Sequence, residues 1–410
     1  MYKTNTHCRM CQSANLKLFF DLGETALANS FLSKEDLNKP EQKYPLKVYF
    51  CNDCGLSQLI HIVEPEIMFR DYVYFSSGMP KLSDHFRNYA EEVVNNFTKS
   101  KDDLVVEIGS NDGILIGAIR EMGPRILGID PAENIAKVAN GRGIETIPDF
   151  FSEKLAGEIL SKYGQAKVII GNNVVAHIDD HRDLIKGVKN LMANDGVFIF
   201  EAPCLVDMFE NLAFDTIYHE HLSYLSVRPL KKFFEQFGLQ IFDVKILPVQ
   251  GNSLRIYVSY PGKYEIKSSV EECLKKEKTL KMDTLEAHKN LAGRASELKE
   301  KVMVTLRNLK KDGKRIAAYG APAKGNTLIS YFNIGPEILD YATESLPSKI
   351  GLYTPGTHIP VIDIQEAKKN PPDYYLLLAW NYKDIILQKE EAFRKNGGKF
   401  IMPIGGNQIL

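Results

Sequence analysis

Leu104-Val-Val-Glu-Ile-Gly-Ser-Asn-Asp-Gly113 begins as a short apolar run and ends in a glycine-containing turn. The run has the length of a buried strand, and the apolar spacing of residues 114–121 predicts a helix directly after it. A second run at 125–130 and a second helical pattern at 131–140 repeat this order. Because strands that alternate with helices pair in parallel, we expect a doubly wound α/β domain around this stretch.

The turn carries residues suited to binding a nucleoside. Glu107 and Asp130 stand at the ends of successive predicted strands, and Gly109 and Gly113 let the backbone approach a ligand closely. An acid at the end of the second strand can accept hydrogen bonds from ribose hydroxyls. Asn111 replaces the middle glycine of a dinucleotide fingerprint, which favours a cofactor without phosphates. The alternative is a turn that only packs a helix on a strand.

The loop resembles the first motif of class I methyltransferases, which bind S-adenosylmethionine (SAM). The resemblance implies that residues after 148 lie beside the adenine and that the end of the strand predicted at 168–171 lies near the methionine. The expected cofactor-binding residues are Glu107, Gly109, Asn111, Gly113, Asp130, Pro131, Asp149, Phe150, Phe151, Asn172 and Asn173.

Two C-x2-C pairs near the start of the chain predict a metal centre. Cys8 and Cys11 form one pair, and Cys51 and Cys54 form the other. Four thiolates in two such pairs are typical of a tetrahedral, structural zinc site. Four unrelated reduced cysteines are the alternative, and a disulfide framework is not expected at this spacing.

The C-terminal third predicts a second α/β domain. A Lys/Glu-rich stretch at 268–311 has the spacing of a long helix or a helix pair. Strand-like runs follow at 315–319, 338–342, 374–378 and 399–402. With 410 residues the chain is long enough for two or three domains. We expect a zinc module at 1–70, a methyltransferase domain at 71–258 and a helical linker with the second α/β domain at 259–410.

Tyr218-His-Glu-His221 gathers titratable side chains behind Glu201, which ends another strand of the first domain. An imidazole with tyrosine and glutamate beside it favours proton transfer. Metal ligation and structural polar packing are the alternatives. His177 also follows a strand end, where open sheets bind ligands, although it could equally be structural.

Together these motifs resemble the nucleotide-sugar C-methyltransferases of deoxysugar biosynthesis, over nearly the whole chain. Further motifs that carry the resemblance are Tyr74-Phe-Ser-Ser77, Asn172-Asn-Val-Val-Ala-His177, Ser253-Leu-Arg255, Ala323-Lys-Gly-Asn-Thr327 and Pro355-Gly-Thr-His-Ile-Pro360. The resemblance implies methylation of C3 in a 4-keto-6-deoxy sugar on a nucleoside diphosphate, through an enolate. It implies His221 as the base, with Tyr218 and Glu220 orienting it and with His177 and Tyr72 or Tyr74 near the sugar.

The loop Gly320-Ala-Pro-Ala-Lys-Gly-Asn-Thr327 is not a Walker motif, because Asn326 stands where that lysine should be. Its amides at a helix start, with Lys324, can still cradle a diphosphate, and a purely structural turn is the alternative. The resemblance places the substrate near Tyr319, Ala323, Lys324, Gly325, Asn326, Ser253, Arg255, Ser345 and His358.

The sequence departs from that family in two places. Gln250-Gly-Asn-Ser253 stands where His-Gly-Gly-Ser is frequent, and Ala321-Pro322 replaces Ala-Thr. An unusual sugar or nucleotide is the resulting hypothesis. Within enzymes, O-methylation of a sugar hydroxyl is the alternative; outside them, it is a non-catalytic nucleotide-sugar binder.

Composition excludes several classes of protein. Hydrophobic residues make up 44% and charged residues 25% of the chain, which is typical of a globular protein and not of disorder. A formal net charge of -1 argues against nucleic-acid or membrane partners. We find neither a signal-like start nor a long apolar span and expect a cytoplasmic protein. The nucleotide base, the sugar stereochemistry and the oligomeric state, for which a monomer is compatible with the sequence, are left open.

Overall fold

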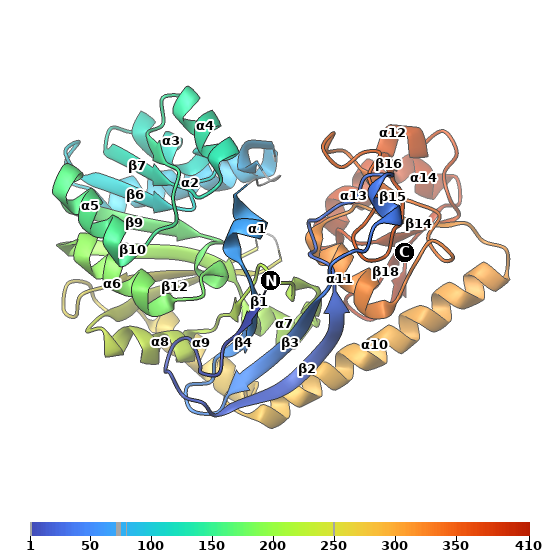
Figure 1. The fold of residues 1–410 in the computed structure, drawn as a ribbon, viewed down its shortest axis with the longest axis horizontal. Helices are drawn as coiled ribbons and strands as arrows, with labels where there is room; N and C mark the ends of the chain where they lie inside the picture. The colour runs from blue at the N-terminus through green and yellow to red at the C-terminus, as the bar shows by residue number, and fades with distance from the viewer. Residues whose placement is uncertain (1, 71–74, 79, 249–250) are drawn as a thin grey trace.

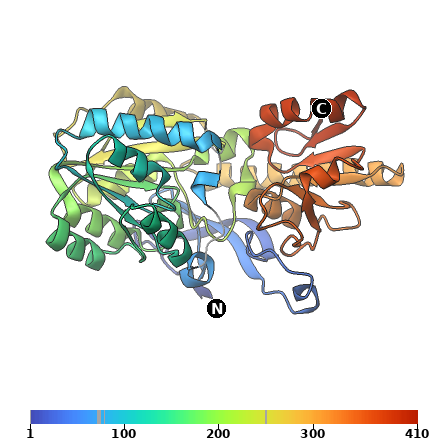
Figure 2. The same ribbon diagram turned by 90° about the horizontal axis from the view of Figure 1, so that it is seen from above.

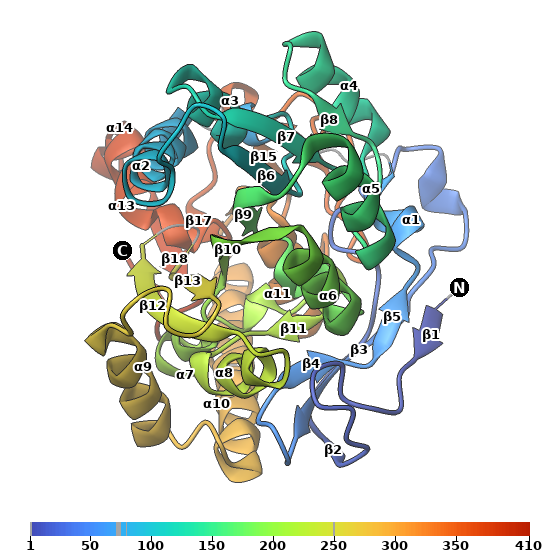
Figure 3. The same cartoon turned by 90° about the vertical axis from the view of Figure 1, so that its left-hand side faces the viewer.

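The computed structural model describes residues 2–70, 75–78, 80–248 and 251–410. Its largest sheet has seven strands in the order β12-β13-β10-β9-β6-β7-β8, as Figure 3 shows. The five strands from β10 to β8 are parallel, and β13 is antiparallel to both of its neighbours. The strand bounds are β6 Leu104–Ile108, β7 Arg125–Ile129, β8 Thr146–Ile147, β9 Ala166–Asn172, β10 Met192–Pro203, β12 Gln240–Leu247 and β13 Ser253–Ser259. The expectation of a doubly wound sheet is confirmed.

Helices cover both faces of this sheet. Alternate side chains of β6 enter different cores: Val105 packs with α2 (Pro80–Phe97) and α3 (Ile114–Glu121), whereas Val106 packs with the opposite layer. That layer contains α5 (Glu153–Tyr163), α6 (His181–Leu191) and α8 (Val227–Gln236). Figure 2 shows α2 and the α5–α6 pair on opposite sides of the strands. Apolar residues throughout β6 follow from this double coverage.

The second α/β sheet lies in the C-terminal third, with the order β16-β15-β14-β17-β18-β19. Its strands are β14 Ile316–Tyr319, β15 Ala342–Glu344, β16 Val361–Asp363, β17 Tyr374–Leu377, β18 Lys399–Met402 and β19 Gln408–Ile409. The strand predicted at 338–342 is wrong in its position, because the amides of Ile338 and Leu339 close a turn on the carbonyl of Gly335. Both apolar side chains are buried in that turn, so burial did not distinguish it from a strand.

A small N-terminal sheet and a helix pair join the two larger parts. The expected pair consists of α9 (Ser268–Thr279) and α10 (Leu285–Lys311), and α10 runs beneath the molecule toward the C-terminal sheet in Figure 1. The small sheet has the order β11-β4-β3-β2, with β2 Leu16–Thr25, β3 Tyr44–Cys51, β4 Ser57–Leu59 and β11 Ser223–Tyr224. Its edge strand β11 comes from the middle of the chain, so the N-terminal module shares its sheet with the central region.

The remaining strands and α-helices are short. They are β1 Tyr2–Thr4, β5 His61–Val63, α1 Pro65–Phe69, α4 Glu133–Gly141, α7 Leu205–Asn211, α11 Ala323–Phe332, α12 Ile364–Ala367, α13 Lys383–Lys389 and α14 Glu391–Lys395. Within the described ranges, each helix is too short or too polar to cross a bilayer.

Candidate functional site

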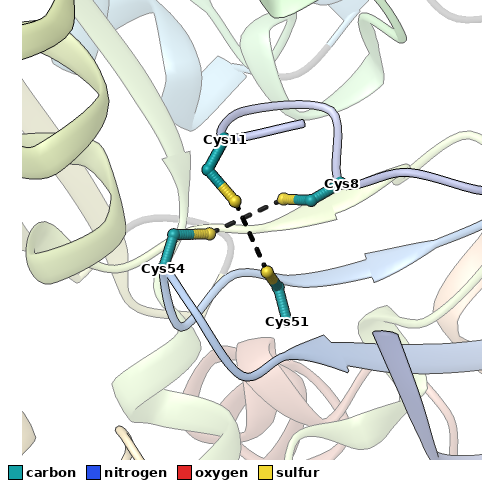
Figure 4. A group of neighbouring side chains, drawn as sticks. All are labelled: Cys8, Cys11, Cys51 and Cys54. Carbon is teal, nitrogen blue, oxygen red and sulfur yellow. Dashed lines mark hydrogen bonds between the residues drawn. The ribbon is translucent and has the colours of Figure 1, made fainter. Parts of the chain in front are cut away.

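The four N-terminal cysteines converge on one point (Figure 4). Cys8 Sγ lies 3.6 Å from Cys54 Sγ, and Cys11 Sγ lies 3.5 Å from Cys51 Sγ. All four sulfurs lie within 4.8 Å of one another. Zinc–sulfur bonds of about 2.3 Å in a tetrahedron require sulfurs about 3.8 Å apart, and the observed spacing matches. The two knuckles therefore form a closed zinc centre, in which every position is taken by protein and the metal is structural.

The turn after β6 carries several of the residues that the sequence predicts to bind the cofactor. The chain runs outward from β6 through β7 to β8 and then returns to β9 on the other side of β6, so the turn after β6 lies at the topological switch point of the sheet. Gly109 and Gly113 adopt φ angles of 68° and 82°. A Cβ atom at Gly109 would lie 3.0 Å from Val174 Cβ, and one at Gly113 would lie 2.6 Å from Ile144 Cδ1. Both glycines are required by conformation and by space.

Two acids face this turn from β6 and β7. Asp130 accepts hydrogen bonds from the amides of Asn111 (2.8 Å) and Ala132 (2.9 Å), and burial raises its pKa. Glu107 is 3% exposed, burial raises its pKa well above the usual value, and its Oε2 has no partner among the described residues. The side-chain amide of Asn172, at the end of β9, is buried and likewise unpartnered within the described ranges. These acceptors and donors fit the hydroxyl, amino and carboxylate groups of SAM.

The other predicted cofactor residues are spread along the same edge. Arg70 joins two of them: its Nη1 lies 3.5 Å from the carbonyl of Pro131, and its guanidinium lies 4.9 Å from the ring centre of Phe150. Asp149 is exposed. The ring of Phe151 packs against Gly187 of α6, so its side chain supports the α5–α6 layer. Asn173 has a φ of 51° and donates its amide to Glu201 O, tying β9 to β10.

His221 lies in a loop before β11, with both ring nitrogens engaged. Nδ1 is 2.8 Å from the carbonyl of Thr216, which can only accept, so Nδ1 carries the proton. Nε2 is 2.8 Å from the hydroxyl of Tyr218 and accepts from it. Burial, followed by the nearby His177, lowers the pKa of His221 well below its usual value. The ring is therefore a neutral imidazole with its Nε2 lone pair directed toward an acidic hydrogen, as a general base requires.

The neighbours predicted for His221 are partly assembled around it. The ring centres of His177 and His221 are 5.0 Å apart, and burial lowers the pKa of His177 to about 4. Glu220 accepts a hydrogen bond from Asn29 of the N-terminal module (2.7 Å), and its role in orienting the His221 ring stays a prediction. Tyr72 and Tyr74 lie outside the described residues, and the prediction for them stands as made.

The C-terminal domain places Lys324 beside this cluster, at the first turn of α11. Burial lowers the pKa of Lys324, while two acids of the central region, Asp215 and Asp207, oppose that effect. Asp215 is fully buried, burial raises its pKa to about 6, and its Oδ2 accepts from Trp380 Nε1 (2.6 Å). The sequence analysis missed both acids and Trp380, because no local pattern links positions 165 residues apart.

The remaining predicted substrate residues have various partners. Tyr319 donates to Glu390 (2.9 Å) within an aromatic core, and Arg255 of β13 pairs with Glu201 of β10 and Glu92 of α2. His358 lies 2.9 Å from Glu41. The others are Ser345, which is exposed; Ser253, which is buried; Ala323, at the start of α11; Gly325, whose Cβ would lie 2.8 Å from Leu378 Cβ; and Asn326, which donates to Ala28 O. Tyr319 and Arg255 are thus held in structural networks in this state.

Gln250 lies outside the described residues, whereas Asn252, two positions later, contacts an acid of the central region. Asn252 Nδ2 donates to Asp207 Oδ1 at 2.6 Å. The departure from the more frequent glycine at this position therefore adds a polar contact to the acid that faces Lys324.

The seven-stranded sheet with one antiparallel strand next to its edge, the glycine loop with its two acids and the four-cysteine centre define a zinc-containing class I methyltransferase whose cofactor is SAM. Residues 8–69 match a model of a zinc binding domain, 82–244 a methyltransferase domain and 248–405 a C-methyltransferase C-terminal domain. The chain belongs to the C-methyltransferase family. It is 37% identical over 404 residues to the C-methyltransferase NovU of Streptomyces niveus, covering 98% of this chain and 96% of that protein.

Two solved methyltransferase structures resemble part of the chain. A SAM-dependent methyltransferase of Anabaena variabilis is 13% identical, with coverage of 44% of this chain and 95% of that one and a TM-score of 0.32. The magnesium protoporphyrin IX methyltransferase of Synechocystis is 14% identical, with coverage of 44% and 83% and a TM-score of 0.34.

Proposed function

We propose that the protein transfers a methyl group from SAM to C3 of a 4-keto-6-deoxy sugar carried on a nucleoside diphosphate. The observation that carries this proposal is the His221 ring, whose Nδ1–H is held by Thr216 O and whose Nε2 is a buried acceptor. A hydrogen beside a ketone is acidic enough for such a base. SAM supplies an electrophilic methyl group when it is bound beside Gly109.

In the proposed reaction, His221 Nε2 takes the proton from C3, and the electron pair of that bond is delocalised onto the keto oxygen at C4. Tyr218, which now donates to Nε2, would turn its hydroxyl toward the developing enolate oxygen. The lowered pKa of His221 keeps the ring unprotonated at neutral pH, so that Nε2 can accept a proton, and the same burial makes the imidazole a weaker base than in water.

Features of the C-terminal domain favour a substrate that is linked to a nucleoside diphosphate. The amides at the start of α11 and the half-buried Lys324 lie next to His221, because Lys324 is close enough to lower the pKa of that histidine, and Asp207 and Asp215 face the lysine. Amides at a helix start and a lysine together suit a diphosphate. Substrate binding would thus close the second α/β domain over the first.

The test is a 4-keto nucleotide sugar deuterated at C3, incubated with SAM and analysed by mass spectrometry. We expect the product to gain one methyl group and lose the deuterium. His221→Asn should reduce turnover at least 100-fold, within the range typical of a lost general base, while the affinity for S-adenosylhomocysteine (SAH) stays unchanged.

Two outcomes would contradict the proposal. Methyl gain with the deuterium retained would indicate O-methylation of a hydroxyl, which needs no enolate. Near-normal turnover of His221→Asn would move the base elsewhere, and His177 is the next residue to replace.

A further inference from the structure

Arg9 stands inside the first zinc knuckle, between Cys8 and Met10, yet its side chain does not face solvent. It is 4% exposed as a residue, although arginine is almost never buried without partners. Its guanidinium donates to the carbonyl of Leu222 (2.5 Å) and to that of Leu59 (2.8 Å), and it lies 3.3 Å from Asp179 Oδ1. These three acceptors come from three separate parts of the chain.

Two of the three acceptors adjoin the histidines of the site. Leu222 directly follows His221, and its carbonyl also accepts from the amide of Leu59, where β4 meets β11. Asp179 follows His177 by two residues, at the end of the turn that carries that histidine. The Arg9 side chain, which follows the zinc ligand Cys8, thus contacts both the segment that carries His177 and the segment that carries His221.

Asp179 is itself held by the N-terminal module. Asn5 Nδ2 donates to its Oδ1 at 2.8 Å, and Lys3 Nζ lies 2.6 Å from its Oδ2. Burial raises the pKa of Asp179, but Arg9 and Lys3 outweigh that effect, so its pKa lies below the usual value and the carboxylate stays charged. The segment after His177 is therefore held to the zinc module by several charged contacts.

We propose that Arg9 is a positioning residue: its contacts hold the segments that carry His177 and His221 at a fixed position relative to the zinc centre. Zinc fixes the backbone of the Cys8–Cys11 knuckle, and the planar guanidinium fixes the Leu222 carbonyl and Asp179 relative to it. Lysine offers one ammonium group and lacks this planar fork, so it is a poor substitute. The inference rests on the proposed role of His221 as the base, and it gives the structural metal a part in shaping the site.

The test compares Arg9→Met with Arg182→Met, a matched control. Arg182 also contacts the zinc knuckle, through the carbonyl of Met10 at 3.4 Å, and it lies over Phe237. Within the described part of the chain it forms no hydrogen bond or ion pair with Leu222 or Asp179. Both variants are assayed for zinc content, SAH affinity, kcat and KM. Histidine side-chain NMR signals are recorded with and without SAH.

For Arg9→Met we expect full zinc content and unchanged SAH affinity, kcat lowered at least tenfold with a smaller change in KM, and shifted signals of His177 and His221. The signals of His221 should no longer report a single Nδ1–H tautomer. Arg182→Met should match the wild type in kcat and in both histidine signals. Wild-type kcat together with wild-type histidine signals in Arg9→Met would overturn the proposal.

Arg9→Lys keeps the charge and serves if Arg9→Met does not fold. We expect an intermediate loss of kcat and the same direction of NMR change, and Asp179→Asn should shift the His177 signal more than that of His221. Unshifted histidine signals in both folded variants would also overturn the inference. Because the NMR readout needs no sugar substrate, a wrong base or acceptor would appear only in the turnover assays and would be distinguishable from a failure of this inference.

Discussion

At the residue scale, the Asp130 carboxylate has one observed contact, with the Gly109 loop, and one predicted contact, with the cofactor. The carboxylate orders the Gly109 loop through the amide of Asn111, and we predict that it also accepts hydrogen bonds from the ribose hydroxyls of the cofactor. Asp130→Asn keeps the shape but removes the charge, and charge-assisted hydrogen bonds contribute about 1.5–3 kcal/mol. We expect SAH affinity by calorimetry to fall about 10- to 100-fold. Asp102→Asn, at an exposed acid before β6 that is not among the predicted cofactor residues, is the control. Unchanged SAH affinity in Asp130→Asn would contradict the prediction.

Single residues also mark where sequence reasoning was sufficient and where it was not. The sequence indicated Gly109, Asp130 and His221 because each belongs to a local motif whose backbone geometry dictates its position. Lys324 and Asp215 face each other across the domains, and only the lysine belongs to such a motif. The acid was missed because its relevance arises from packing and burial, which local spacing does not encode.

At the scale of elements, the start of α10 holds a histidine in an aromatic environment. His288 is fully buried. Its ring centre lies 4.4 Å from that of Phe50 and 4.9 Å from those of Phe19 and Phe209. Its Nδ1 is 2.8 Å from the carbonyl oxygen of Thr284. The burial lowers the pKa of His288 to about 4. α10 is thus joined to β2 and β3 by a ring that must stay neutral.

This arrangement predicts a pH-dependent stability. Between pH 4 and 6.5 the unfolded chain protonates His288 while the folded protein does not, so stability from this group is lost as pH falls below 6.5. His288→Phe removes the effect. In urea unfolding, the free energy of the wild type relative to the variant should rise by up to about 2 kcal/mol between pH 5 and 7. A difference that does not change with pH would contradict the burial argument.

Elements were predicted well where hydrophobic spacing was unambiguous. Ile114–Glu121 and Leu104–Ile108 have the bounds that their apolar patterns indicated. The strand predicted at 338–342 lies instead at Ala342–Glu344. The residues before it form a buried turn, and a buried turn and a buried strand can have the same composition. Backbone hydrogen bonds, which depend on the neighbouring strand, decide between them.

For the whole molecule, the chain's single tryptophan reports on the contact between domains. Trp380 belongs to the C-terminal domain and donates to Asp215 of the central region. Asp215→Ala should shift the fluorescence emission to longer wavelength and raise KM for the nucleotide sugar about tenfold, with SAH affinity unchanged. Asp340→Ala, which breaks ion pairs with Lys310 and Arg315 elsewhere in that domain, is the control. Unchanged emission and KM in Asp215→Ala would contradict a role in closing the domains.

The sequence by itself determined the chemistry that depends on local spacing: the four zinc ligands, the glycine loop with its acid, and the alternation of strands and helices. Each of these depends on residue types at short, regular spacings within a segment of the chain. Only the tertiary structure decided which distant segments meet. The pairing of β11 with β4, the Arg9 contacts and the Asp215–Trp380 bond join parts of the chain up to 213 residues apart. Such contacts depend on how whole sheets and helices bury their apolar faces together, and that sum over the molecule cannot be read from any one stretch.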